Sequence, residues 1–212
     1  MNHIAIRREY RNRWERCTPL VPDDVVDLVV EGIRLTVQSS SIRAHSDKAF
    51  ETAGASVGDL IDDVDLIMGI RELPAEAINQ SAAWLMFSHT SEGQAQNMRM
   101  LRRLMETKST LLDYALIANE EGEHLVMFGH HAEESSTAET FSTEESLELS
   151  SHLSRDLCPF IPSLARASLE AASVAESGLP KILQRACILW RGRLTGPFSK
   201  LAVPLEKYGN TE

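Results

Sequence analysis

Short apolar runs alternate with amphipathic segments over the first two thirds of the chain. The apolar runs are compact and rich in β-branched residues, which is typical of buried strands. They predict strands at residues 4–6, 33–38, 65–70, 84–88, 110–114 and 124–128. The segments between them have the spacing of amphipathic helices and predict helices at 22–31, 46–54, 74–80 and 94–108. Strands that alternate with helices in this way indicate an α/β fold.

The run at 65–70 (DLIMGI) is apolar without alternation, as expected for a strand of a parallel sheet covered on both faces. We therefore expect a three-layer parallel sheet of the flavodoxin-like type over residues 1–129. After residue 141 the pattern changes, and it predicts helices at 143–157, 161–170 and 180–189. These helices suggest a helical tail over residues 142–212 that packs back on the sheet domain.

Residues 130–141 are polar and predict a linker between these two parts. The linker lies within an acidic region, because residues 109–154 hold ten carboxylates and no lysine or arginine. The formal net charge of the whole chain is −10. A nucleic-acid partner is disfavoured, since phosphate binding requires positive charge.

The composition is that of a globular protein, with 212 residues of which 43% are hydrophobic. No apolar run approaches the length of about 20 residues that crosses a bilayer, and residues 1–20 lack the apolar stretch of a signal peptide. The three cysteines are widely spaced and form no CxxC motif, which is typical of a reducing compartment. We expect a cytoplasmic protein without a membrane partner.

An arginine cluster follows the first predicted strand, in the segment RREYRNRWERCTPLVP at residues 7–22. Guanidinium groups bind carboxylates in a bidentate manner, so the cluster is a candidate anion site. The alternative is a solvated basic loop. Within the segment, Cys17 close to arginines is also a candidate reactive thiol if the sheet edge there is partly exposed.

Five segments of the first 129 residues share their order with a known family: VQSSSIRAHSDKAFETAGA, LIMGIRELP, FSHTSEGQAQNM, TLLDYALI and HLVMFG. With the arginine segment they resemble the saccharopine-forming lysine–2-oxoglutarate reductases, in the alanine dehydrogenase/transhydrogenase N-terminal domain superfamily. The tail segments ELSSHLSRDLCPFIPSLA and LPKILQRACILWRGRLT resemble the end of that reductase region in bifunctional lysine-ketoglutarate reductase/saccharopine dehydrogenases. The resemblance implies that the Rossmann domain between the two blocks is missing, with the 130–141 linker in its place.

The resemblance also implies roles for several residues. His89, in FSHT, matches the catalytic histidine of the family, and it follows a predicted strand, where α/β sheets place their sites. Glu72 and Arg16 match retained substrate-site positions. The family's catalytic lysine falls on Arg71, which cannot lose its proton to act as a base.

Three further positions depart from the family pattern. Cys17 stands at a family arginine position, Glu92 at a lysine position, and Ala115 at the position of an acid. The substrate half therefore retains its apolar strands but has lost several of its polar site groups.

The family uses NADPH, which a Gly-x-Gly-x-x-Gly turn would bind, and this sequence contains no such motif. We therefore expect no cofactor in this chain. We also expect no metal, because the adjacent pair His130–His131 cannot easily direct both rings at one ion and no cysteine joins them.

Three functions are compatible with these observations. The first is a truncated member of the reductase lineage without independent catalysis. The second is a module that binds lysine, 2-oxoglutarate or saccharopine, or that pairs with a full-length relative or with a second copy of itself. The third is a reductase half that a separate NADPH-binding chain completes.

Overall fold

The strands of the chain form one mixed sheet in a computed structural model, which describes residues 1–9, 16–128 and 141–209. Within these residues the order is β3-β2-β1-β4-β5-β6-β7-β8. Strands β1 to β6 pair in parallel, whereas β7 and β8 pair antiparallel at one edge. The strands are β1 (Ile4–Ile6), β2 (Leu35–Gln38), β3 (Ser56–Gly58), β4 (Leu66–Arg71), β5 (Ala83–Phe87), β6 (Thr110–Asp113), β7 (Cys187–Trp190) and β8 (Arg193–Leu194).

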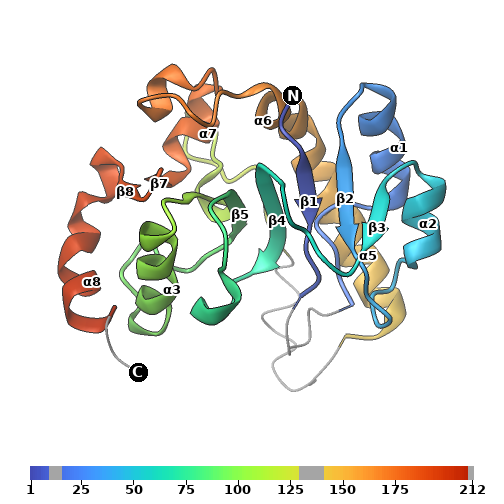
Figure 1. Cartoon of the computed structure of the whole chain (residues 1–212), viewed down its shortest axis with the longest axis horizontal. Coiled ribbons are helices and arrows are strands. Elements are labelled where there is room, and N and C mark those ends of the chain that lie inside the picture. The colour runs from blue at the N-terminus through green and yellow to red at the C-terminus, as the bar shows by residue number, and fades with distance from the viewer. Residues whose placement is uncertain (10–15, 129–140, 210–212) are drawn as a thin grey trace.

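Helices cover both faces of this sheet (Figure 1). The α-helices are α1 (Pro22–Val30), α2 (Asp47–Thr52), α3 (Ala95–Glu106), α5 (Thr143–Leu157), α6 (Ile161–Arg166), α7 (Lys181–Arg185) and α8 (Ala202–Tyr208). Short 3₁₀ turns lie at η1 (Ala75–Ala77), η2 (Tyr114–Leu116), η3 (Cys158–Phe160), η4 (Val174–Glu176) and η5 (Gly196–Leu201). No helix in the described part of the chain combines the length and apolar character that a bilayer crossing requires.

Two hydrophobic cores lie on opposite faces of the sheet, because successive side chains of a strand point to opposite sides. Ile4 and Ile6 of β1 face the core beneath α1, α5, α6 and α7, while Ala5 between them faces the core beneath α3 and α8. Helices α3 and α8 also contact each other (Figure 1). The predicted three-layer α/β architecture and the C-terminal helices are thus confirmed, and the parallel order 2-1-3-4-5 of a flavodoxin-like sheet is present if the short edge strand β3 is set aside.

Two element predictions were wrong, and both concern the same sheet edge. Residues 124–128 form no strand: they contribute a single bridge between Ala118 and His124. The place beside β6 belongs to β7, which was predicted as part of a helix at 180–189. Helix α7 ends at Arg185, and the residues after it, all buried, run as a strand into a two-residue hairpin turn at Arg191 and Gly192. The tail therefore extends the sheet as well as covering it.

Helix α5 packs against the N-terminal part of the chain through a stripe of serines. Ser146, Ser150 and Ser154 are four residues apart and have no exposed surface. The backbone N–H of Thr18 donates to Ser150 Oγ (3.0 Å), and that of Val21 donates to Ser154 Oγ (3.0 Å). Small side chains allow this close approach, and their hydroxyls satisfy backbone donors that would otherwise be buried without partners.

The carboxyl ends of the parallel strands meet at one edge of the sheet. Strands β1 and β4 lie side by side there. After β1 the chain continues to β2 on one side of this pair, and after β4 it continues to β5 on the other side. Such a switch point is where open α/β sheets form their ligand sites. Arg7 follows β1, Arg71 ends β4 and His89 follows β5, so the topology brings the predicted site residues to this edge.

Candidate functional site

A cluster of three side chains lies at the carboxyl ends of β4 and β5. His89 Nδ1 is 2.8 Å from Glu72 Oε2, and His89 Nε2 is 2.9 Å from Nη1 of Arg71. The side chains of His89 and Glu72 are 41% and 37% exposed, so the cluster is open to solvent. Both ring nitrogens of the histidine are therefore occupied by groups of its own chain.

The contact with Glu72 places a proton on one nitrogen of the imidazole. A carboxylate is an acceptor only, so Nδ1 carries a proton and donates it to Glu72. Arg71 is a donor only, and its Nη1 lies 2.9 Å from Nε2 and 3.5 Å from Nδ1. Burial alone would raise the pKa of Glu72, but the hydrogen bond from His89 and the charges of His89 and Arg71 outweigh it, so this pKa lies below its ordinary value.

The backbone of His89 adopts an unusual conformation that its neighbours hold. Its φ is +47°, in the left-handed region that side-chain-bearing residues seldom occupy. Asp113, at the end of β6, accepts hydrogen bonds from the N–H (3.1 Å) and the hydroxyl of Ser88, and Asn97 donates to the carbonyl of His89 (3.1 Å). Burial raises the pKa of Asp113, and the hydrogen bonds from Ser88 partly offset the effect. Asp113 thus fixes the direction of the His89 side chain without touching it.

A buried ion pair lies beneath the cluster. Arg7 Nη1 is 3.2 Å from Glu9 Oε1, and both side chains are at most 2% exposed. The β4–β5 register shifts between Met68 and Arg71, which leaves two N–H groups for the Glu9 carboxylate: it accepts from Ile70 (2.8 Å) and Arg71 (3.1 Å). Burial, opposed by the charge of Arg7, raises the pKa of Glu9. The sequence analysis did not predict that Arg7 and Glu9 form an ion pair.

Gly69 makes room for this ion pair. A Cβ atom at position 69 would stand 2.5 Å from both Cζ and Nη2 of Arg7. The guanidinium of Arg7 also donates to the carbonyl of Arg71 and, over 3.1 Å, to that of Arg8. The flat group therefore lies against the β4 backbone, where any side chain larger than hydrogen would displace it.

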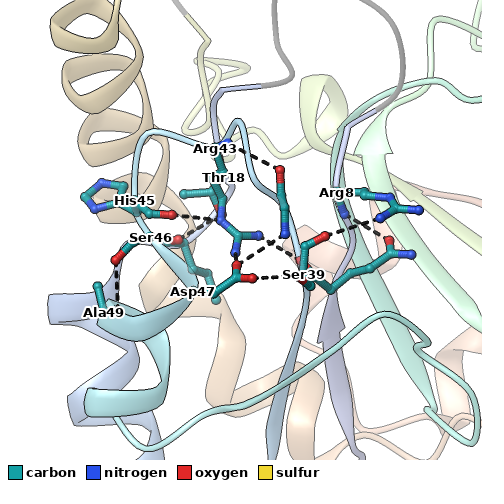
Figure 2. Close-up of polar contacts among 11 residues, drawn as sticks. Arg8, Thr18, Ser39, Arg43, His45, Ser46, Asp47 and Ala49 are labelled. Carbon is teal, nitrogen blue, oxygen red and sulfur yellow. Dashed lines mark hydrogen bonds and ion pairs between the residues drawn. The ribbon is translucent and has the colours of Figure 1, made fainter.

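A second buried arginine organises the loop after β2. Arg43 donates to the carbonyls of Gln38 (3.0 Å) and His45 (3.1 Å) and pairs with Asp47, as Figure 2 shows in part. Its guanidinium also lies 4.7 Å from the centre of the Phe50 ring. Burial lowers the pKa of Arg43, and Asp47 counteracts the shift.

This loop connects to the first strand. The N–H of Arg8 donates to the side chain of Gln38 (3.1 Å), and Nη1 of Arg8 contacts the carbonyl of Ser39 (3.4 Å; Figure 2). Arg43 thus joins the end of β2, the loop at His45 and the start of α2, and it supports the shape of this part of the sheet. The sequence analysis assigned no such role to Arg43 or Asp47.

Comparison with known proteins places the chain in a family. The profile described as "Alanine dehydrogenase/PNT, N-terminal domain" matches residues 5–134, more than half of the chain. The chain belongs to this family. The matched region contains every strand from β2 to β6, most of β1, and the Arg71–Glu72–His89 cluster.

Several relatives share this region. An alpha-aminoadipic semialdehyde synthase of Arabidopsis thaliana is 36% identical over 135 residues, which cover 61% of this chain and 13% of that protein. A mitochondrial alpha-aminoadipic semialdehyde synthase of Rattus norvegicus is 33% identical over 129 residues, covering 61% and 14%. A saccharopine dehydrogenase [NAD(+), L-lysine-forming] of Neurospora crassa is 29% identical over 134 residues, covering 61% and 36%. The chain thus spans 13–14% of the length of the two synthases it matches.

The remaining predicted site residues of this family member lie apart from His89. Arg16 is half-buried and donates through Nη1 to Thr143 at the start of α5 (3.1 Å). Cys17 is 3% exposed, and burial raises its pKa to about 12, although side-chain hydrogen bonding with Ser146 and Ser150 opposes the shift. The alternative of a partly exposed, reactive Cys17 thiol is therefore wrong, because the thiol is buried against the serine stripe of α5.

The other two departures from the family pattern are at the surface. Glu92 is 71% exposed and lies 3.4 Å from Lys200 Nζ in η5. Ala115 is exposed, and its N–H donates to Asp113 (2.9 Å). Among the described residues, no group of three His, Cys, Asp or Glu side chains is arranged to hold a metal ion. The His130–His131 pair and most of the 130–141 linker lie outside the described residues.

Proposed function

We propose that this chain is a substrate-side domain of the lysine–2-oxoglutarate reductase lineage that does not catalyse the reaction on its own. The observation that carries the proposal is the contact between Arg71 and His89 Nε2. It occupies the ring nitrogen that would otherwise exchange a proton with a substrate. Membership of the alanine dehydrogenase/PNT N-terminal domain family supports the lineage.

The chemistry of the resembling reductases explains why this contact matters. Joining the ε-amine of lysine to the ketone of 2-oxoglutarate requires protons to leave nitrogen and to reach oxygen, which general acids and bases accelerate. A lysine can lose its proton when its pKa is lowered, whereas an arginine stays charged at working pH. Arg71 thus supplies charge but no base, and it occupies Nε2 of His89 while Nδ1 donates to Glu72.

The reduction step would use hydride from NADPH, which in the resembling enzymes a Rossmann domain binds. The sequence contains no Gly-x-Gly-x-x-Gly turn to approach a pyrophosphate. We propose that residues 130–141 replace that domain, that the chain was shortened there, and that it works in the cytoplasm, unlike the relative named as mitochondrial.

An activity assay tests the absence of catalysis. The purified chain is mixed with lysine, 2-oxoglutarate and NADPH, and saccharopine is measured by mass spectrometry, with a full-length synthase as positive control. We expect no saccharopine from the chain, and none from Arg71→Lys, because a restored base still lacks a hydride donor site. NADPH-dependent saccharopine formation by the unmodified chain would overturn the proposal.

A second candidate function is ligand binding at the same edge, alone or in a complex with a full-length relative. It is favoured by the exposure of the cluster, with the His89 and Glu72 side chains both more than a third exposed beside a fixed positive charge. A carboxylate of 2-oxoglutarate would compete with His89 for Arg71. Calorimetry with lysine, glutamate and 2-oxoglutarate tests this, using Arg71→Gln as the variant and the exposed Arg99→Gln of α3 as the matched control. Binding that survives Arg71→Gln would place the ligand elsewhere.

A further inference from the structure

A cleft lies at the opposite end of the sheet from the Arg71–His89 cluster. It has a volume of about 450 Å³, which is within the range of small-molecule sites. It lies where α3 ends and β6 begins, beside the β7–β8 hairpin turn. Its walls are formed by Met105, Lys108, Ala172, Trp190, Arg191, Gly192 and Arg193.

The lining of this cleft is positive in a chain with a net charge of −10. It contains Lys108, Arg191 and Arg193 and no carboxylate. Arg191 is paired with Glu170, at 2.9 Å. In the described part of the chain, neither Lys108 nor Arg193 has an ion-pair partner. Two uncompensated cations therefore border one cavity.

A smaller adjoining cleft, of about 230 Å³, shares Lys108 and Arg191 but has a different character. Asp65 and Glu170 line it as well. Their carboxylates repel an anion, so an anionic group is directed to the larger cleft. The contrast between the two clefts gives the larger one a defined charge preference.

The backbone at two of the cations is in a conformation that is unfavourable for their side chains. Lys108 has φ +56° and Arg191 has φ +49°, in the left-handed region where glycine or asparagine is usual. Lys108 follows the end of α3 at the position that glycine most often takes. Arg191 is the first residue of a two-residue hairpin turn, where asparagine or glycine predominates. Two long cations thus occupy strained positions on the same cavity.

The two strained segments are fixed against each other. Gly192 donates its N–H to the carbonyl of Ser109 (2.7 Å), and Arg191 donates its N–H to Thr110 Oγ1 (3.1 Å). A Cβ at Gly192, whose φ is +77°, would stand 2.5 Å from the carbonyl oxygen of Met105. The hairpin turn therefore rests directly on the end of α3, which fixes the backbone that carries these exposed cations.

We propose that this cleft binds a small organic dianion, with its oxyanion groups held by Lys108 and Arg193 and with Arg191 at the rim. A phosphate ester and a dicarboxylate both supply this chemistry, since each presents paired anionic oxygens to ammonium and guanidinium groups. Met105 and Trp190 provide an apolar wall for a short carbon segment between the charges. The site is independent of the Arg71–His89 cluster and of any reductase ancestry.

Calorimetric titration with glycerol 3-phosphate, a phosphate ester, and with succinate, a dicarboxylate, tests the proposal and separates the two sources of charge. We expect saturable binding of at least one probe to the unmodified chain, weakening as salt screens the charges. The double variant Lys108→Asn/Arg193→Gln should weaken it at least about tenfold, which corresponds to about 1.4 kcal/mol. The double variant Lys48→Gln/Arg155→Gln changes the same charge at exposed positions of α2 and α5 and should bind as the unmodified chain does.

A stability measurement shows that the loss of binding is not a loss of fold. Asparagine tolerates the left-handed conformation better than lysine, so Lys108→Asn should leave the melting temperature unchanged or raise it by about 2–4 °C. Weaker binding by a protein at least as stable supports a ligand role for the lysine. Absence of binding for both probes, or equal binding by the Lys108→Asn/Arg193→Gln variant, would overturn the proposal.

Discussion

Replacing Gly69 by alanine tests the role of the buried Arg7–Glu9 ion pair. The added Cβ would stand 2.5 Å from Cζ and Nη2 of Arg7, well inside contact distance. Arg7 is held firmly in place, because its side chain is 2% exposed and bonded to Glu9 and to two backbone carbonyls. The guanidinium must therefore leave its place, and the Glu9 carboxylate stays buried without its partner.

The expected loss in the free energy of unfolding follows from the separation of Arg7 and Glu9. Breaking a buried ion pair by removing one partner costs about 3–5 kcal/mol, since the remaining charge is uncompensated. Glu9 retains its two backbone donors, Ile70 and Arg71, which favours the lower half of that range. We expect Gly69→Ala to lower the free energy of unfolding by about 3 kcal/mol, a large part of the roughly 5–15 kcal/mol that a typical domain possesses.

Urea denaturation followed by tryptophan fluorescence measures this change. Gly58→Ala in β3 is the matched control, because the nearest atom to its Cβ, the carbonyl oxygen of Leu60, is 3.9 Å away. In the background Arg7→Met/Glu9→Gln, which removes both charges, Gly69→Ala should cost clearly less than in the unmodified chain. If Gly69→Ala costs no more than Gly58→Ala, or the same in both backgrounds, the ion pair does not carry the effect and the reasoning fails.

Three further predictions concern other buried groups. Asp113→Asn should destabilise the fold by about 2 kcal/mol, since an amide cannot accept all the hydrogen bonds of the carboxylate. The same substitution should shift the NMR signals of the His89 ring, and unchanged signals would exclude a positioning role for Asp113. Ser150→Ala should cost about 1–3 kcal/mol by orphaning a buried N–H, whereas the exposed Ser151→Ala should cost under about 0.5 kcal/mol; equal losses in urea melts would contradict this. Burial raises the pKa of the Cys17 thiol to about 12, so the free energy of unfolding should fall as the pH rises from about 9 toward about 12. Cys17→Ser should make this fall less steep, and an unchanged slope would refute the prediction.

The parallel part of the sheet was predictable from local pattern because each of its main strands is a short apolar run between helices. The errors arose where local pattern is ambiguous. By periodicity alone, residues 187–190 fit a helix as well as a strand. They form a strand because they pair with the edge of β6. The run at 124–128 is apolar, but β7 occupies the edge where it would have paired. Only the three-dimensional pairing resolves such cases.

The candidate site was predictable in part. His89, Arg71 and Glu72 lie together as their positions after neighbouring strands implied, since carboxyl ends of parallel strands meet at one edge. Arg16 and Cys17 lie at the start of α5 instead, because the serine stripe of that helix binds the backbone beside them. Sequence spacing carried no information on a contact between residues more than 120 positions apart.

The contacts of the serine stripe of α5 join the start of the chain to segments that are synthesised last. The backbone donors of Thr18 and Val21 find their acceptors 132 and 133 residues later, and the side chain of Asn2 bonds to the carbonyls of Leu164 and Ala167. A nascent chain released only to residue 128 has made all its parallel strands but lacks the helices α5, α6 and α7 over one face. Helix α1 already covers part of that face, and the rest stays exposed to water until α5, α6 and α7 emerge. The sheet therefore depends on its last third, or on a chaperone in the interval, to remain soluble while it is being made.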